Sequence, residues 1–194
     1  ILGIVIFSLI VLELVGYLLL EVRNRIENYN YAKTAPLYKN KLAAYRMMIE
    51  EDEKAPLSRY SPFILWRRKD FNGNYVTIID GIRKTCYSDP NATLTIWMFG
   101  GSTMEGYRAE NNCKTIPSLL AKKFREKNQS ANVLNYGVGG FASTQEMIYF
   151  IQLLKETKKP PSVVIFYDGA NDLGLGRNIK KSEKSLMVDT HASY

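Results

Sequence analysis

The chain has 194 residues, of which 46% are hydrophobic and 23% charged, and its net charge is +7. This length accommodates one domain of ordinary size with a further segment, and the apolar share suffices for a core. The positive charge is spread along the chain without a zinc-finger, RRM or helix-turn-helix pattern, so no nucleic acid partner is expected. One histidine and two separated cysteines make no metal-ligand cluster. We therefore expect no metal and no other cofactor.

Residues 1–22 predict a transmembrane anchor. The first twenty are predominantly apolar, and as a helix they would span about 30 Å, the thickness of a hydrocarbon core. No small-residue cleavage site of the kind that ends a signal peptide follows them. Glu13 lies within this run, and a lone carboxylate is costly in lipid. We expect Glu13 either to face a membrane-protein partner or to lie near one end of a tilted helix.

Residues 23–59 predict a helical stalk between the membrane and a domain. Apolar residues of segment 42–49 recur at helical spacing, and Pro56 ends the pattern because the residue before a proline avoids the helical region. Arg23 and Arg25 would draw this flank toward the cytoplasm by the positive-inside rule, but long domains translocate largely regardless of charge. We expect a single-pass membrane protein whose domain is extracytoplasmic, at the periplasmic or outer face.

Residues 60–91 predict a hairpin that leads into the main domain and packs on its edge. Its two expected strands are 63–66 and 75–79, and Asn72-Gly73 between them is a turn signal.

Residues 92–194 predict an α/β domain. Buried strands are expected at 93–99, 133–136 and 162–167, with helices at 115–127 and from residue 143 onward. Ser143 and Glu146 have the spacing of a capping box. The alternation predicts a three-layer α/β/α parallel sheet, and the final strand and helix that such a sheet would need are not recognisable before residue 194. Ligand sites in these sheets lie at the carboxyl ends of the strands.

Each of the three expected strands ends in a glycine-containing polar loop. The first loop contains Gly101 and Ser102, the second ends at Gly140, and the third contains Asn171. A serine on a tight glycine turn presents its hydroxyl at the sheet edge. The amides of Ser102 and Gly140 and the side chain of Asn171 are donors able to converge on one developing oxyanion.

These loops carry a family resemblance. Gly-Gly-Ser at 100–102, N-x-G-x-x-G at 135–140 and G-x-N-D at 169–172 resemble blocks I, II and III of the SGNH (GDSL-type) hydrolases. The flanking text is similar to that of membrane-anchored bacterial members whose first block reads GGST. The resemblance covers about residues 93–172 and implies an SGNH- or flavodoxin-like fold.

The resemblance also implies roles for single residues. Ser102 would be the nucleophile, and Gly140 and Asn171 would complete the oxyanion hole with the Ser102 amide. Asp172 would be structural. The implied activity is that of a serine esterase or acyltransferase acting on acyl esters, O-acetyl groups included, of cell-surface glycans or lipids.

Two features depart from the family pattern. Gly101 replaces the usual Asp of block I. The family's base belongs to a later Asp-x-x-His block, whereas His191 follows Asp189 by two positions and Asp172 by only 19 residues. We therefore do not expect His191 to be the base. A serine without a base is a poor nucleophile, so either the histidine lies beyond Tyr194 or the protein is a catalytically inactive scaffold subunit of a membrane complex.

A third reading is dinucleotide binding. Residues 137–142 match G-x-G-x-x-A between a strand and a helix, and Asp168 ends the next strand. This reading leaves the Ser102 and Asn171 loops unexplained.

The two cysteines bracket the strand that leads to Ser102. A disulfide between Cys86 and Cys113 would indicate an oxidising compartment, and two free thiols are the alternative, because spacing alone does not decide connectivity.

Overall fold

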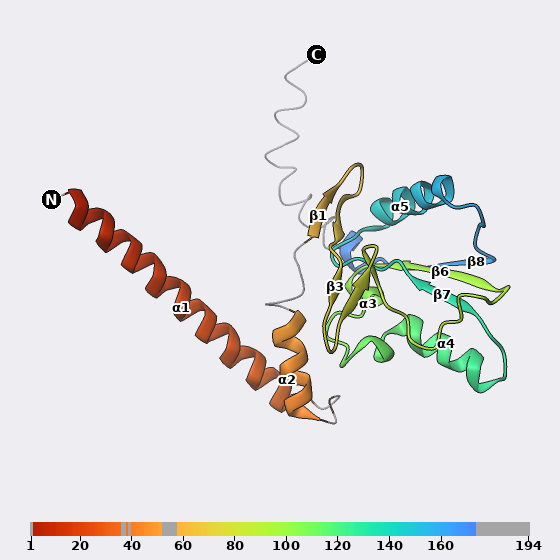
Figure 1. The fold of residues 1–194 in the computed structure, drawn as a ribbon, viewed down its shortest axis with the longest axis horizontal. Coiled ribbons are helices and arrows are strands. Elements are labelled where there is room, and N and C mark those ends of the chain that lie inside the picture. Colours follow the sequence, from red (N-terminus) through yellow and green to blue (C-terminus); the bar gives the residue numbers. More distant parts are fainter. Residues whose placement is uncertain (1, 36–37, 39, 52–57, 174–194) are drawn as a thin grey trace, which may run out of the picture. The chain divides into compact units, whose positions relative to one another are not determined.

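The computed structural model describes residues 2–35, 38, 40–51 and 58–173 (Figure 1). The chain divides into two compact units, Ile1–Lys54 and Ala55–Tyr194. Each unit is described by itself.

The first unit contains helices α1 (Leu2–Thr34) and α2 (Lys41–Ile49). Helix α1 runs without a break past residue 22, where the sequence placed the end of the anchor, and the pair Arg23–Glu27 supports the helix beyond its apolar part. Tyr29 of α1 and Tyr45 of α2 meet edge to face at 5.6 Å. The one helix of the described residues that is long and apolar enough to cross a membrane is α1.

The second unit is built on a sheet of six strands in the order β3-β4-β5-β7-β6-β8. The strands are β3 (Phe71–Asn72), β4 (Thr77–Ile79), β5 (Ile82–Arg83), β6 (Thr95–Gly100), β7 (Asn132–Asn135) and β8 (Val163–Tyr167). Strand β6 pairs in parallel with β7 and β8, whereas β5 runs antiparallel to β7, with Arg83 opposite Asn135. The sheet is therefore mixed rather than wholly parallel, because residues 71–83 extend it as an antiparallel meander.

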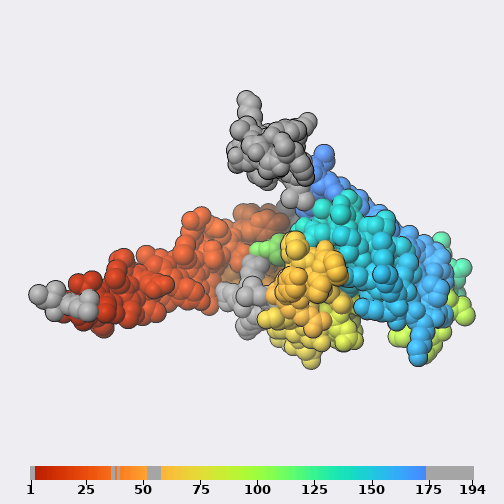
Figure 2. Space-filling view, turned by 90° about the horizontal axis from the view of Figure 1, so that it is seen from above, coloured from red at the N-terminus to blue at the C-terminus, as the bar shows by residue number. Residues whose placement is uncertain are grey.

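A separate hairpin, β1 (Ser58–Ser61) with β2 (Leu65–Arg68), precedes the sheet. The sequence placed a strand at 63–66, but Phe63 and Leu65 have positive φ values of 68° and 73°, so the chain turns there. The turn predicted at Asn72-Gly73 is present, although it joins β3 to β4. The hairpin lies alongside helix α5 (Ser143–Glu156), where Gln145 and Gln152 donate to backbone carbonyls of the hairpin turn (Figure 2).

Helices cover both faces of the sheet (Figure 1). Every residue of β6 is buried, and its side chains alternate between the faces. Trp97 and Phe99 pack with Tyr149 of α5, whereas Ile96 and Met98 pack with Ala121 of α4 (Ile116–Glu126). The three-layer arrangement places β6 at the centre, with its carboxyl end at Gly100.

The two flanking helices begin differently from one another. Thr115, where the sequence placed the first residue of this helix, caps α4, its side chain accepting from the Ser118 amide. In α5 the capping box predicted for Ser143 and Glu146 is wrong. Ser143 is already helical and its hydroxyl donates to Asp172 at 2.6 Å, while Gln145 reaches back to the Ala142 amide.

Candidate active site

Ser102 begins a short helix, α3 (Ser102–Glu105), directly after β6. A Cβ on Gly100 would lie 2.5 Å from the carbonyl oxygen of Tyr167, and a Cβ on Gly101 would lie 2.6 Å from the side-chain nitrogen of Asn171. The Gly100 position is therefore restricted by backbone, whereas a side chain at Gly101 would displace the Asn171 amide.

The third loop is tied to the second by two side chains. Asn171 donates from Nδ2 to the carbonyl oxygen of Phe141 at 2.6 Å. Asp172 accepts from the Ser143 amide and hydroxyl, and this hydrogen bond from the hydroxyl lowers the pKa of the Asp172 carboxyl. An amide group has two N–H donors, so Asn171 retains a second one while the first fixes its position.

The second loop packs against helix α3 through its glycines. A Cβ on Gly137 would lie 2.3 Å from the backbone nitrogen of Glu105, so no side chain fits there. Asn135 supports the same contact, accepting from the Gly137 amide and donating to the Glu105 carbonyl. Gly140 has a φ of +82°, which favours glycine.

Glu105 is a functional candidate that the sequence did not reveal. Its side chain is buried, with 3% of the residue exposed. One carboxylate oxygen accepts from Arg68 Nε at 2.5 Å and the other from the Gly139 amide at 2.6 Å. Arg68 comes from the hairpin, 37 positions earlier in the chain. No local sequence motif predicts an ion pair between these two residues.

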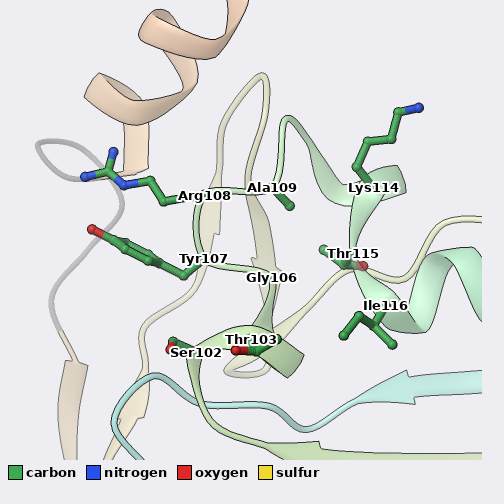
Figure 3. Close-up of a pocket in the computed structure, with 9 residues that line it drawn as sticks. All are labelled: Ser102, Thr103, Gly106, Tyr107, Arg108, Ala109, Lys114, Thr115 and Ile116. Carbon is green, nitrogen blue, oxygen red and sulfur yellow. The ribbon is translucent and has the colours of Figure 1, made fainter. Parts of the chain in front are cut away.

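Two hollows adjoin Ser102. One, of about 150 Å³, is lined by Ser102, Thr103, Phe141 and the third loop, Asn171 included. The other, of about 390 Å³, also has Ser102 and Thr103 in its wall and extends to Tyr107 and Thr115. The charged ends of Arg108 and Lys114 point away from Ser102 in this second hollow (Figure 3).

Glu146 is a second buried carboxyl at this edge of the sheet. It is fully buried, and neither carboxyl oxygen has a hydrogen-bond partner among the described residues. Burial, together with the nearby carboxylates of Asp168 and Asp172, raises the pKa of Glu146 to about 8. The group is therefore largely protonated near neutral pH.

Two of the predicted site residues, Ser102 and Asn171, line one hollow. Gly140 does not line it, but a Cβ on the preceding Gly139 would lie 4.0 Å from the Ser102 Cβ. His191 lies outside the described residues.

The second loop, residues 135–140, also provides a test of the dinucleotide-binding interpretation. A pyrophosphate needs free amide donors at the loop before a helix, whereas the Gly139 amide already donates to the Glu105 carboxylate. A phosphate placed there would meet that negative charge, so the geometry disfavours this reading.

Cys86 and Cys113 form a disulfide, with their Cα atoms 4.9 Å apart. The bond closes a segment that contains β6 and Ser102.

Comparison with solved structures gives a partial likeness to an esterase. No protein-family profile matches the chain, and no curated protein sequence does. Among solved structures, AlinE4, an SGNH-hydrolase family esterase, is 26% identical, with a TM-score of 0.40, over 46% of this chain and 46% of its own. Two single-substitution variants of AlinE4 align with TM-scores of 0.40 and identities of 26% and 25%. The chain thus spans less than half the length of these esterases.

Proposed function

We propose that this protein is a membrane-anchored serine esterase or acyltransferase of the SGNH type, acting on acyl esters of cell-surface glycans or lipids. The observation that carries the proposal is the hollow that Ser102 and Asn171 line together. Beside it lies the second loop, which is held by the hydrogen bond from the Gly139 amide to Glu105. A hydroxyl and several amide donors around one small space are what acyl transfer requires.

The proposed reaction begins with attack of the Ser102 oxygen on the acyl carbonyl. The amides of Ser102 and Gly140 and the free N–H of Asn171 would donate to the resulting oxyanion. Its collapse releases the alcohol and leaves an acyl-serine, which water or a second alcohol then cleaves. The base that takes the serine proton and returns it to the leaving alcohol is assigned to a residue outside the described part of the chain.

Membrane anchoring belongs to the same proposal. Helix α1 has the length and composition of a membrane span. A tether of this kind would hold the domain near lipid or glycan esters at the cell surface, on the extracytoplasmic side. Glu13 would then be available to a membrane-protein partner of α1.

An inactive scaffold subunit is the second candidate. It is favoured by one observation, the carboxyl group of Glu13 within the apolar part of α1, which suits a partner helix better than lipid.

Labelling with a fluorophosphonate separates the two candidates. The full-length protein in detergent is treated with the probe beside Ser102→Ala and, as a matched control, Ser130→Ala, which removes an exposed serine far from the three loops. The esterase proposal predicts that wild type and the control are labelled and that Ser102→Ala is not. Folded wild-type protein that stays unlabelled would favour the scaffold.

A further inference from the structure

The hairpin β1–β2 contacts the candidate site although it belongs to neither the sheet nor the three loops. Its strand β2 contributes Trp66 and Arg68, and both reach the second loop, directly or through Glu105. Core packing also fixes the hairpin: Ile64 is fully buried in the same cluster as Tyr149 of α5, and Trp66 packs edge to face on Phe141 at 5.7 Å.

Both backbone polar groups of Gly139 are held by this assembly. Its amide donates to Glu105 Oε2 at 2.6 Å, and its carbonyl oxygen accepts from Trp66 Nε1 at 3.2 Å. The Gly139 carbonyl belongs to the peptide whose nitrogen is that of Gly140. Because a peptide unit is planar, fixing the carbonyl also fixes the direction of the Gly140 N–H.

The charge on Glu105 makes its partner necessary. A buried carboxylate is costly to leave unpaired, and Arg68 supplies the compensating charge at 2.5 Å. The Trp66 ring also leaves little space beside Gly140, since a Cβ there would lie 3.3 Å from the ring. The loop therefore has one arrangement while the hairpin is in place.

We propose that the hairpin positions the second loop (residues 135–140), with Trp66 and the Arg68–Glu105 pair as positioning residues that orient the Gly140 N–H. This inference rests on the proposed function, because it assigns that N–H to an oxyanion. It adds that Trp66 and Arg68 of the hairpin support the candidate site, so the hairpin is more than a connector. The pair acts through Gly139 and touches no reacting atom.

The test compares neighbouring arginines of the same strand in the full-length protein. Arg68→Gln removes the partner of Glu105, whereas Arg67→Gln removes a side chain that donates to the Asp80 carbonyl and lies over Tyr149, and that makes no hydrogen bond to residues 137–141 within the described part of the chain. Arg68→Lys keeps a cation, and Trp66→Phe keeps an aromatic ring but removes the indole N–H that donates to the Gly139 carbonyl.

Two readouts are measured, kcat and KM on a p-nitrophenyl ester and amide hydrogen exchange of segment 137–141. Arg68→Gln is expected to lower kcat about 100-fold with KM little changed, because a misplaced donor costs rate at the transition state. It is also expected to speed exchange in that segment at least tenfold. Arg68→Lys should recover part of both, Trp66→Phe should show a smaller loss of the same kind, and Arg67→Gln should show neither.

The outcomes separate the two proposals. Wild type that is inactive would count against the esterase, and the exchange data alone would then decide whether the hairpin positions the loop. Exchange in segment 137–141 that is equal in wild type and Arg68→Gln would overturn the positioning role, as would a loss of kcat in Arg67→Gln equal to that in Arg68→Gln.

Discussion

Gly101 offers the sharpest steric test of the oxyanion hole. A methyl group at this position would lie 2.6 Å from Asn171 Nδ2, where an ordinary contact begins at 3.4 Å. Gly101 has a φ of −80° and a ψ of −149°, so its φ is one that alanine adopts but its ψ lies beyond the broad β region. The substitution Gly101→Ala therefore acts mainly through its contact with Asn171, whose amide must move by about 1 Å to restore an ordinary contact.

The expected loss follows from the role proposed for Asn171. Removing one oxyanion donor costs about 10² to 10³ in kcat, or about 3–4 kcal/mol. We expect Gly101→Ala and Asn171→Ala each to fall in this range when hydrolysis of a short p-nitrophenyl ester is followed. Because both act on the same amide, the double variant should be no slower than Asn171→Ala.

Two results would refute this reasoning. Wild-type kcat in Gly101→Ala would mean that Asn171 is not an oxyanion donor or that its amide moves without consequence. A double variant whose loss is the product of the two single losses would mean that the residues act independently.

Three further predictions concern stability, each followed by urea unfolding. The raised pKa of Glu146 means that the folded protein holds this proton more tightly than the unfolded chain, so its contribution to stability is complete below pH 4.5 and is lost up to about pH 8. The free energy of unfolding of Glu146→Gln should therefore rise relative to that of wild type across this window, by up to about 1.4 kcal/mol per pH unit. Parallel dependences of the two unfolding free energies on pH would contradict this. Reduction of the bond between Cys86 and Cys113, 27 positions apart, should cost about 3–4 kcal/mol, whereas a loss below about 1 kcal/mol would refute the estimate. Gly137→Ala should lose about 3 kcal/mol or more, because its Cβ would meet backbone and not a mobile side chain; wild-type stability would show that α3 can move away.

The central strands and the loops after them could be predicted from the sequence. Strand β6 is a continuous apolar run that ends at glycines, and Thr115 with Pro117 marks the start of α4. Each site loop follows directly from the end of a strand, so the assembly of Ser102 beside Asn171 could be expected from the topology alone.

The meander and the hairpin could not be predicted in the same way. Strands β3 and β5 have two residues each, too few for an alternating pattern to show. The hairpin turns at residues with positive φ that are neither glycine nor asparagine, so the usual turn signal is missing. Tertiary contacts determine the conformation of both the meander and the hairpin.

The pair of Arg68 and Glu105 shows a further limit. A buried ion pair joins residues from separate elements, and nothing in the sequence near either one indicates its partner. The start of α5 is similar: Ser143 has the residue type of a cap, but Asp172, 29 positions later, takes its hydroxyl. Long-range partners override local signals in both cases.

The most direct test of the account is to trap the acyl-enzyme. The full-length protein is mixed with a short-chain acyl ester, quenched in acid during turnover, digested and analysed by mass spectrometry. We expect the mass of one acyl group on Ser102, and none in Ser102→Ala. Turnover with no acyl group on Ser102, or with the group on another residue such as Thr103, would contradict the account.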